Sequence, residues 1–267
     1  MIRSVEHWGM NNTSRDVIAM NDKNGGTECP YQKTIQHAAA SDNANFSKLA
    51  ADLAKVGRNF YLHGWALGTS GNFSAVTSLD PLRLVISSTG LDKSSLTPIQ
   101  FLEIDDNNNI VKGDGCPSAE ALLHIAIVRC MNAAAVLHTH SVWSTVLSNT
   151  HASNGGITLE GYEMLKGLEG VQTYQHREWL PIIENSTDMI ELSQRVCTTL
   201  QDSSGIHGFL LRGHGLYTWG PNVHQAKRHI EILEFLMEVL VKSAEYSHHN
   251  GADHRFSGNR RRRSLWP

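Results

Sequence analysis

The chain has 267 residues, with 23 Lys and Arg against 26 Asp and Glu, so its formal net charge is −3. This even balance excludes a strongly basic nucleic-acid-binding protein and provides no charge that would hold the chain on an acidic membrane surface. Hydrophobic residues make up 40% of the sequence, enough for one sizeable core, and no apolar stretch reaches the roughly 20 residues of a membrane span. We therefore expect a soluble protein with one folded domain.

Both ends of the chain differ in composition from the middle. Residues 1–44 are rich in Asn, Ser, Asp and Gly, which predicts a flexible N-terminal extension. Residues 247–267 include the run Arg260–Arg263, which predicts a basic, disordered tail. The folded domain is then expected over 45–246.

The four cysteines show no Cys-x-x-Cys spacing, and a chain of this length does not need disulfides to fold. We therefore expect them to be reduced, and a reducing cytoplasm is the expected location. They are Cys29, Cys116, Cys130 and Cys197.

The first half of the domain alternates between helical and strand-like patterns. Apolar residues at three- and four-residue steps predict an opening helix, and short alternating runs separated by turn residues predict two hairpins. The second hairpin has an asparagine-rich tip, and a serine stands near the start of the helix that follows. The expected elements are a helix over 45–63, strands over 68–76 and 82–88 around Asp80-Pro81, strands over 101–105 and 110–113, and a helix over 118–131.

The second half repeats this alternation and ends in a long amphipathic helix, whose apolar stripe we assign to packing. Strands joined by short turns, with helices between them, predict an α/β fold with a mainly antiparallel sheet covered by helices. The expected elements are a strand over 133–140, helices starting at Ser141 and over 186–200, strands over 206–211 and 216–219, and a helix over 221–246.

Three histidines form the most informative pattern in the chain. His138 and His140 follow an apolar run and stand two residues apart, so at the end of a strand their side chains lie on one face. His214 stands far downstream between two glycines, on a predicted turn. Three neutral imidazoles suit Zn²⁺ and leave one coordination position open, as in catalytic zinc sites. With 15 histidines in the chain, a chance pair is the alternative.

Two glutamates are candidates for acid–base chemistry beside such a metal. Glu120 lies near the start of the helix predicted over 118–131, and Glu163 lies in a glycine-punctuated segment after the histidine pair. Taken alone, each is more often a solvated surface residue.

Two glycine-containing turns are candidate anion sites. Gly71-Asn72 and Ser88-Thr89-Gly90 each place polar groups beside a glycine, where backbone N–H groups can approach a phosphate. Ser118, near a helix N-terminus, is the third candidate because helix N-termini attract anions. Ordinary turns are the alternative, since neither stretch is a known nucleotide-binding motif.

Taken in order, these motifs resemble the class II aldolase and adducin family over about residues 50–240. The resemblance implies a three-layer α/β/α fold with a largely antiparallel central sheet and a homotetramer. It also implies one zinc ion per subunit on His138, His140 and His214, and a sugar-phosphate substrate. The motifs are 69–74, 88–90, 117–120, 138–140 and 213–215.

Within the family, the segments 138–141 and 163–167 most resemble the dehydratases of methionine salvage. That resemblance implies conversion of 5-methylthioribulose 1-phosphate to 2,3-diketo-5-methylthiopentyl 1-phosphate and water. A base removes the C3 proton, a metal ion stabilises the enediolate, and an acid assists departure of the C4 hydroxyl. The resemblance implies that Glu163 carries this proton traffic and that the phosphate binds at Gly71, Asn72, Ser88, Thr89, Gly90 and Ser118.

Glu120 keeps two other activities open. It matches the acid–base glutamate of the sugar-phosphate aldolases, so a fuculose-1-phosphate-type aldolase or a pentose-5-phosphate 4-epimerase is the alternative. A third possibility is a non-catalytic interaction module of the adducin type. Such modules would be expected to lose the metal ligands, whereas this chain has all three histidines.

Overall fold

The computed structural model describes residues 40–256, with side chains over 43–246. Within them, nine strands form one sheet in the order β4-β3-β2-β1-β5-β9-β8-β7-β6. Neighbouring strands are antiparallel except β7 and β8, which confirms the predicted α/β class with a largely antiparallel sheet. The strands are β1 (Asn72–Leu79), β2 (Leu82–Ser87), β3 (Phe101–Asp105), β4 (Ile110–Lys112), β5 (Ala135–Thr139), β6 (Gly156–Glu160), β7 (Arg177–Ile183), β8 (Gly208–Leu211) and β9 (Gly215–Gly220).

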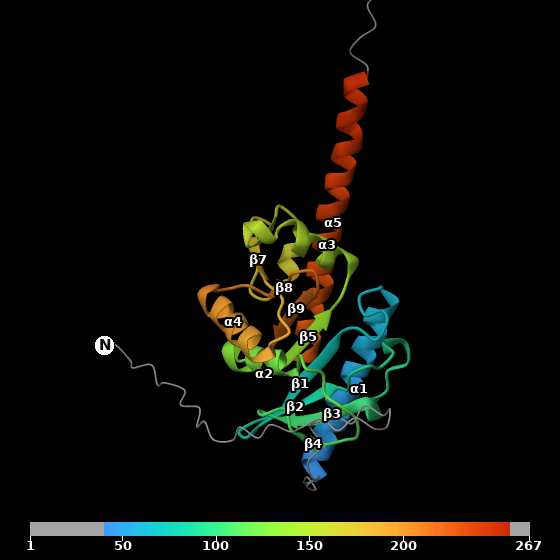
Figure 1. Cartoon of the computed structure of the whole chain (residues 1–267), viewed down its shortest axis with the longest axis vertical. Coiled ribbons are helices and arrows are strands. Elements are labelled where there is room, and N and C mark those ends of the chain that lie inside the picture. Colours follow the sequence, from blue (N-terminus) through green and yellow to red (C-terminus); the bar gives the residue numbers. More distant parts are fainter. Residues whose placement is uncertain (1–39, 257–267) are drawn as a thin grey trace, which may run out of the picture.

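Helices cover both faces of this sheet, so the fold has three layers (Figure 1). Strand side chains alternate between the faces: in β5, Ala135 and Leu137 join one hydrophobic cluster and Val136 joins the other. The first cluster packs against α1, α3 and α5, and the second against α2 and α4. The helices are α1 (Ala40–Leu62), α2 (Ala121–Met131), α3 (Val142–Thr150), α4 (Met189–Asp202) and α5 (Val223–Phe256).

Most predicted elements are present, with shifted ends. The helix expected from Ser118 begins at Ala121, and Glu120 occupies the position before it. Strands β6 and β7 were not predicted from the sequence. Strand β7 contains Pro181, which cannot donate to a sheet and argues against a strand, but pairing with β6 and β8 holds it in the sheet.

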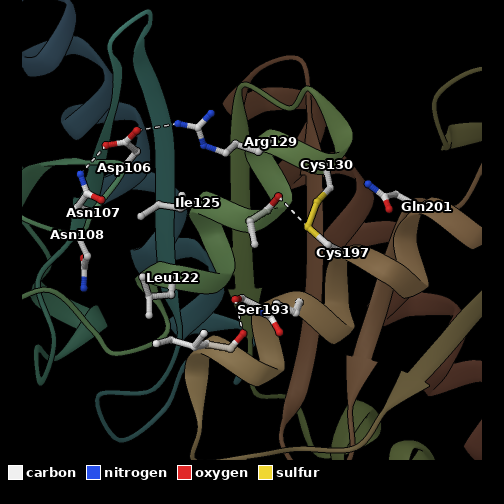
Figure 2. A pocket seen from close by; sticks show the side chains of 13 residues that line it. Asp106, Asn107, Asn108, Leu122, Ile125, Arg129, Cys130, Ser193, Cys197 and Gln201 are labelled. Carbon is white, nitrogen blue, oxygen red and sulfur yellow. Dashed lines mark hydrogen bonds and ion pairs between the residues drawn. A yellow bond between two sulfur atoms is a disulfide. The ribbon is translucent and has the colours of Figure 1, made fainter. Parts of the chain in front are cut away.

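A disulfide joins α2 to α4, and the expectation of reduced cysteines was therefore wrong. Cys130 and Cys197 are 67 residues apart in sequence, but the packing of the two helices brings their Cα atoms to 5.8 Å (Figure 2). Spacing in sequence could not reveal this pair. The disulfide lines a pocket of about 790 Å³ between α2, α4 and residues 106–108, and no lining residue belongs to the histidine cluster described below.

The predicted terminal segments lie largely outside the described residues. Of the extension expected over 1–44, only the first residues of α1 are described, and of the tail expected over 247–267, only the backbone of the end of α5. No helix in the described part of the chain has the length and apolarity needed to cross a membrane.

Candidate metal centre

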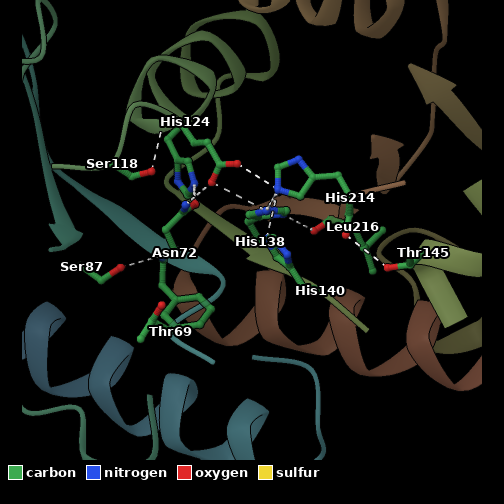
Figure 3. Close-up of polar contacts among 12 residues, drawn as sticks. Thr69, Asn72, Ser87, Ser118, His124, His138, His140, Thr145, His214 and Leu216 are labelled. Carbon is green, nitrogen blue, oxygen red and sulfur yellow. Dashed lines mark hydrogen bonds and ion pairs between the residues drawn. The ribbon is translucent and has the colours of Figure 1, made fainter. Parts of the chain in front are cut away.

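The strand order explains how three distant histidines meet. Strand β9 pairs antiparallel with both β5 and β8, so β5 and β8 run in the same direction and end at the same edge of the sheet. His138 lies in β5, His140 directly follows it, and His214 occupies the tight turn after β8 (Figure 3). The structure thus brings together the three imidazoles that the sequence singled out.

The Nε2 atoms of the three rings face one another. His214 Nε2 lies 3.1 Å from His140 Nε2 and 3.4 Å from His138 Nε2. Ligands of a tetrahedral zinc ion, at bond lengths near 2.0–2.1 Å, stand about 3.3 Å apart. Together with Glu120, these rings form a group of ligand atoms within 4.8 Å of one another.

His138 is held in the tautomer that can bind a metal through Nε2. His138 donates from Nδ1 to the carbonyl oxygen of Leu216 over 3.0 Å, so the neutral ring presents a lone pair at Nε2. Burial keeps the pKa of His138 well below its ordinary value and lowers the pKa of His140 to about 4. Three ring nitrogens that face one another at these distances fit a cation at their centre.

Two glycines allow the backbone to approach this centre. A Cβ atom on Gly215 would lie 2.0 Å from the carbonyl oxygen of Thr139, and one on Gly71 would lie 2.8 Å from that of His138. Gly71 also has a φ of +77°, which other residues rarely adopt. A larger residue at either position would displace the strand that carries the ligands.

Glu120 is the carboxylate that the structure brings to the histidines. Its Oε1 lies 3.0 Å from His214 Nε2, and its Oε2 lies 3.8 Å from His138 Nε2. Burial alone would raise the pKa of Glu120, but His138, His214 and the hydrogen bond from Asn72 together lower it below its ordinary value. An ionised carboxylate therefore faces the centre.

A chain of hydrogen bonds behind Glu120 fixes its position. Asn72 Nδ2 donates to Glu120 Oε2, and Asn72 Oδ1 lies 2.5 Å from Nε2 of the buried His124. His124 Nδ1 in turn lies 2.7 Å from the hydroxyl of Ser74, and burial lowers the pKa of His124 to about 4. A neutral His124 donates to Asn72 and accepts from Ser74. This role of His124 could not be predicted, because a lone histidine on an apolar helix face gives no signal in the sequence.

The candidate anion loops adjoin the centre. Ser88 Oγ donates to the carbonyl oxygen of Cys116 and accepts from its N–H, each over 3.0 Å, which ties 88–90 to the segment before α2. Ser118 Oγ accepts from the N–H of Glu120 over 3.2 Å. Gly90 has a φ of +70°, and the N–H of Thr89 donates to the same Cys116 carbonyl.

Lys93 is a buried cation between these loops. Its Nζ donates to the carbonyl oxygens of Thr69 and Leu91, over 3.0 and 2.9 Å. The side chain is only 1% exposed, and burial lowers its pKa to about 8. The charge of Lys93 also helps to lower the pKa of His140, so it acts on the centre. Its position three residues after Gly90, at the end of the Ser88-Thr89-Gly90 turn, was the available sequence signal.

Glu163 lies apart from this cluster in the single chain. It begins the short 3₁₀ helix η4 (Glu163–Gly167), with its side chain 71% exposed and 2.6 Å from Lys166 Nζ. Exposure leaves this carboxylate available to another molecule.

Comparison with known proteins identifies the family. The model of the "Class II Aldolase and Adducin N-terminal domain" matches residues 51–241, well over half of the chain. The chain belongs to the class II aldolase and adducin family.

Two relatives within this family share much of the sequence. A methylthioribulose-1-phosphate dehydratase of Yersinia enterocolitica is 40% identical over 203 residues, which are 76% of this chain and 93% of the relative. One of Serratia proteamaculans is 43% identical over 180 residues, covering 67% and 87% of the two chains. The crystal structure of an L-fuculose-1-phosphate aldolase from Thermus thermophilus superposes with a TM-score of 0.61 at 23% identity, covering 76% of this chain and 98% of that one. This structural match confirms the class II aldolase fold.

Proposed function

We propose that the protein is a zinc-dependent hydro-lyase that converts 5-methylthioribulose 1-phosphate to 2,3-diketo-5-methylthiopentyl 1-phosphate and water. The supporting observation is the convergence of His138, His140 and His214 in a chain 40% identical to a dehydratase of that name. The reaction needs a stabilised negative charge beside the substrate carbonyl, a base at C3 and an acid at the C4 hydroxyl.

The three histidines hold one divalent ion, and the nitrogen donor set favours zinc. When bound, the ion supplies Lewis-acid stabilisation to the ketose oxygens. Leu216 keeps the His138 ring in its binding tautomer. Glu120, 3.0 Å from His214, stands where it can accept or return a proton beside the substrate.

Glu163 is proposed as the acid–base group at C3 and C4, supplied by a neighbouring subunit. Its exposure and its absence from the group of ligand atoms around the histidines in one chain fit a role across a subunit boundary. The proposed assembly is a homotetramer. The cytoplasm stays the proposed location, although the Cys130–Cys197 disulfide removes the argument from reduced cysteines.

The substrate phosphate is proposed to bind between the two glycine-containing loops and the start of α2. Gly90 has open space where a side chain would stand, and both Gly71 and Gly90 have a positive φ, a turn conformation in which backbone N–H groups can face an anion. The N–H groups at the start of α2, next to Ser118, add a favourable dipole. Buried Lys93 adds a positive charge between the loops.

A sugar-phosphate aldolase is the second candidate. The observation that favours it is Glu120, a carboxylate against the metal ligands, which could accept the proton of the C4 hydroxyl when the C3–C4 bond breaks. A non-catalytic module is the third candidate, and a complete set of metal ligands counts against it.

Parallel incubations distinguish these functions. The zinc-loaded protein is incubated with 5-methylthioribulose 1-phosphate and with L-fuculose 1-phosphate, and the products are identified by mass spectrometry. A diketone from the first substrate supports the dehydratase. An aldehyde from the second supports the aldolase, and a folded protein that binds no divalent ion supports the module.

A further inference from the structure

A second cluster of two imidazoles and a carboxylate lies where β7 and β8 begin, at the opposite ends of the strands from the three histidines. Strands β7 and β8 run parallel; Glu178 is the second residue of β7, and His207 directly precedes β8. His214 follows the other end of β8, and a four-residue strand is about 13 Å long. This cluster is therefore separate from the metal centre described above.

The three side chains converge on one oxygen atom. His176 Nε2 lies 2.8 Å and His207 Nδ1 lies 3.0 Å from Oε2 of Glu178, and the three ligand atoms lie within 4.8 Å of one another. Donor atoms around tetrahedral zinc stand about 3.3 Å apart, so shifts of a few tenths of an ångström would admit an ion. The set of two histidines and one glutamate is one that zinc sites use.

Backbone groups fix the donors, as they do at the first centre. His207 Nε2 lies 2.9 Å from the carbonyl oxygen of Glu169, which can only accept, so Nε2 carries the proton. In the neutral ring, Nδ1 then presents a lone pair toward the Glu178 carboxylate. Lone pair and carboxylate can lie this close only with a cation between them, either a proton on Nδ1 or a metal ion.

The carboxylate is buried and oriented before any ion binds. The side chain of Glu178 is 1% exposed, and its Oε1 accepts the backbone N–H of His207 over 2.8 Å. A buried carboxylate favours a cation beside it, and the 27% exposed side chain of His176 gives an ion a path from solvent.

We propose that His176, Glu178 and His207 form a second divalent-metal site of the zinc type, independent of the site on His138, His140 and His214. Its ligands join the start of β8 to the segment between η4 and β7. A bound ion cross-links that segment, which begins next to Glu163–Gly167, to the sheet. The proposal does not depend on which reaction the first centre catalyses.

The test measures zinc alone, without turnover. Zinc per chain is determined by mass spectrometry of metal content for the wild type and for His176→Ala, which changes a partly exposed residue, after equal exposure to zinc. We expect about two zinc ions per chain in the wild type and about one in His176→Ala. In a zinc titration against a chromogenic chelator, loss of this ligand should weaken one site by about 100-fold or more. His224→Ala, an exposed histidine outside both clusters, is the matched control and should keep both ions.

A variant that lacks the first site shows whether the second site binds zinc independently. The double variant His138→Ala/His214→Ala should retain about one zinc ion, and adding Glu178→Gln should remove it while circular dichroism stays unchanged. If the double variant does not fold, the comparison of wild type with His176→Ala decides alone. One zinc ion per chain in both the wild type and His176→Ala would overturn the proposal. The cation on His207 would then be a proton. The first site and the proposed function would stand in that case.

Discussion

Asn72 donates a hydrogen bond of 2.5 Å to Oε2 of Glu120, so an amide on β1 fixes a carboxylate at the start of α2. In the β1–β5 pairing, Asn72 stands opposite His138, a proposed metal ligand. One register therefore places the proposed ligand and the group that orients Glu120 side by side. A shift of one residue in this pairing would turn Asn72 to the other face of the sheet. Glu120 would then lose the amide that holds it beside the histidines.

Removing a ligand histidine tests the first centre. His138→Ala and His214→Ala should each lose the zinc ion of this site and its turnover together, because two remaining nitrogens cannot hold a catalytic ion. The measurement is zinc content beside the initial rate, with His224→Ala as the control. Unchanged zinc stoichiometry in both ligand variants would contradict the site.

Replacing Glu163 tests its proposed acid–base role. Glu163→Gln keeps the size of the side chain but cannot exchange the proton, so turnover should drop by about 100-fold or more. Zinc content and substrate binding should change little. Steady-state rates are compared with those of Glu120→Gln, and wild-type turnover in Glu163→Gln would assign the role to Glu120.

Mixing two inactive variants tests whether Glu163 acts across subunits. Co-expressed His138→Ala and Glu163→Gln chains form hybrid oligomers in which an intact histidine set can meet an intact Glu163 from the neighbour. Activity in the hybrids should rise well above that of either variant alone. If no activity returns although hybrids are isolated, the site is complete within one chain.

The parts of the site that sequence predicts are those set by local pattern. His138 and His140 stand two apart after an apolar run, and His214 lies in a turn where Gly215 is required by the 2.0 Å approach to Thr139. Both hairpins, the strand before His138 and the final helix follow from periodicity and turn residues, and the structure confirms them.

Long-range packing decides what sequence could not predict. Asn72 was expected to bind phosphate, but its side-chain amide is engaged by Glu120 and His124 through strand register. Its proposed phosphate contact therefore has to come from the backbone. The Cys130–Cys197 pair and the strands β6 and β7 likewise arise only when distant segments pack together.

Lys93 provides a test of the proposed phosphate site. Lys93→Met keeps the apolar stem but removes the charge and both bonds between the loops, so KM for a phosphorylated substrate should rise by about 10- to 100-fold, with kcat less affected. Because burial lowers the pKa of Lys93 to about 8, wild-type KM should also rise as pH increases through 8, whereas the KM of the variant stays high and flat. KM is measured between pH 7 and 9, with the exposed Lys48→Met as control. A KM within twofold of wild type would exclude this role.

Glu234 links the ligand strand to α5 and makes stability depend on pH. Its Oε1 accepts from the hydroxyl of Thr139 over 2.9 Å, and burial raises its pKa from 4.5 to about 7. Between these values the folded state binds a proton that the unfolded state has lost, so the free energy of unfolding falls as pH rises from about 4.5 to 7.

Glu234→Gln should remove this pH dependence, because glutamine stays neutral and can still accept from Thr139. Relative to wild type, the variant should gain stability between pH 5 and 8, by up to roughly 3 kcal/mol, since one pKa unit is about 1.4 kcal/mol. Denaturant unfolding of both proteins in chelator excludes any contribution from metal binding. Glu160→Gln, in an exposed ion pair with Arg177, is the control and should follow the wild-type curve. Parallel curves for Glu234→Gln and wild type would mean that Glu234 is ionised in the folded protein, and a compensating cation near Thr139 would then have to be sought.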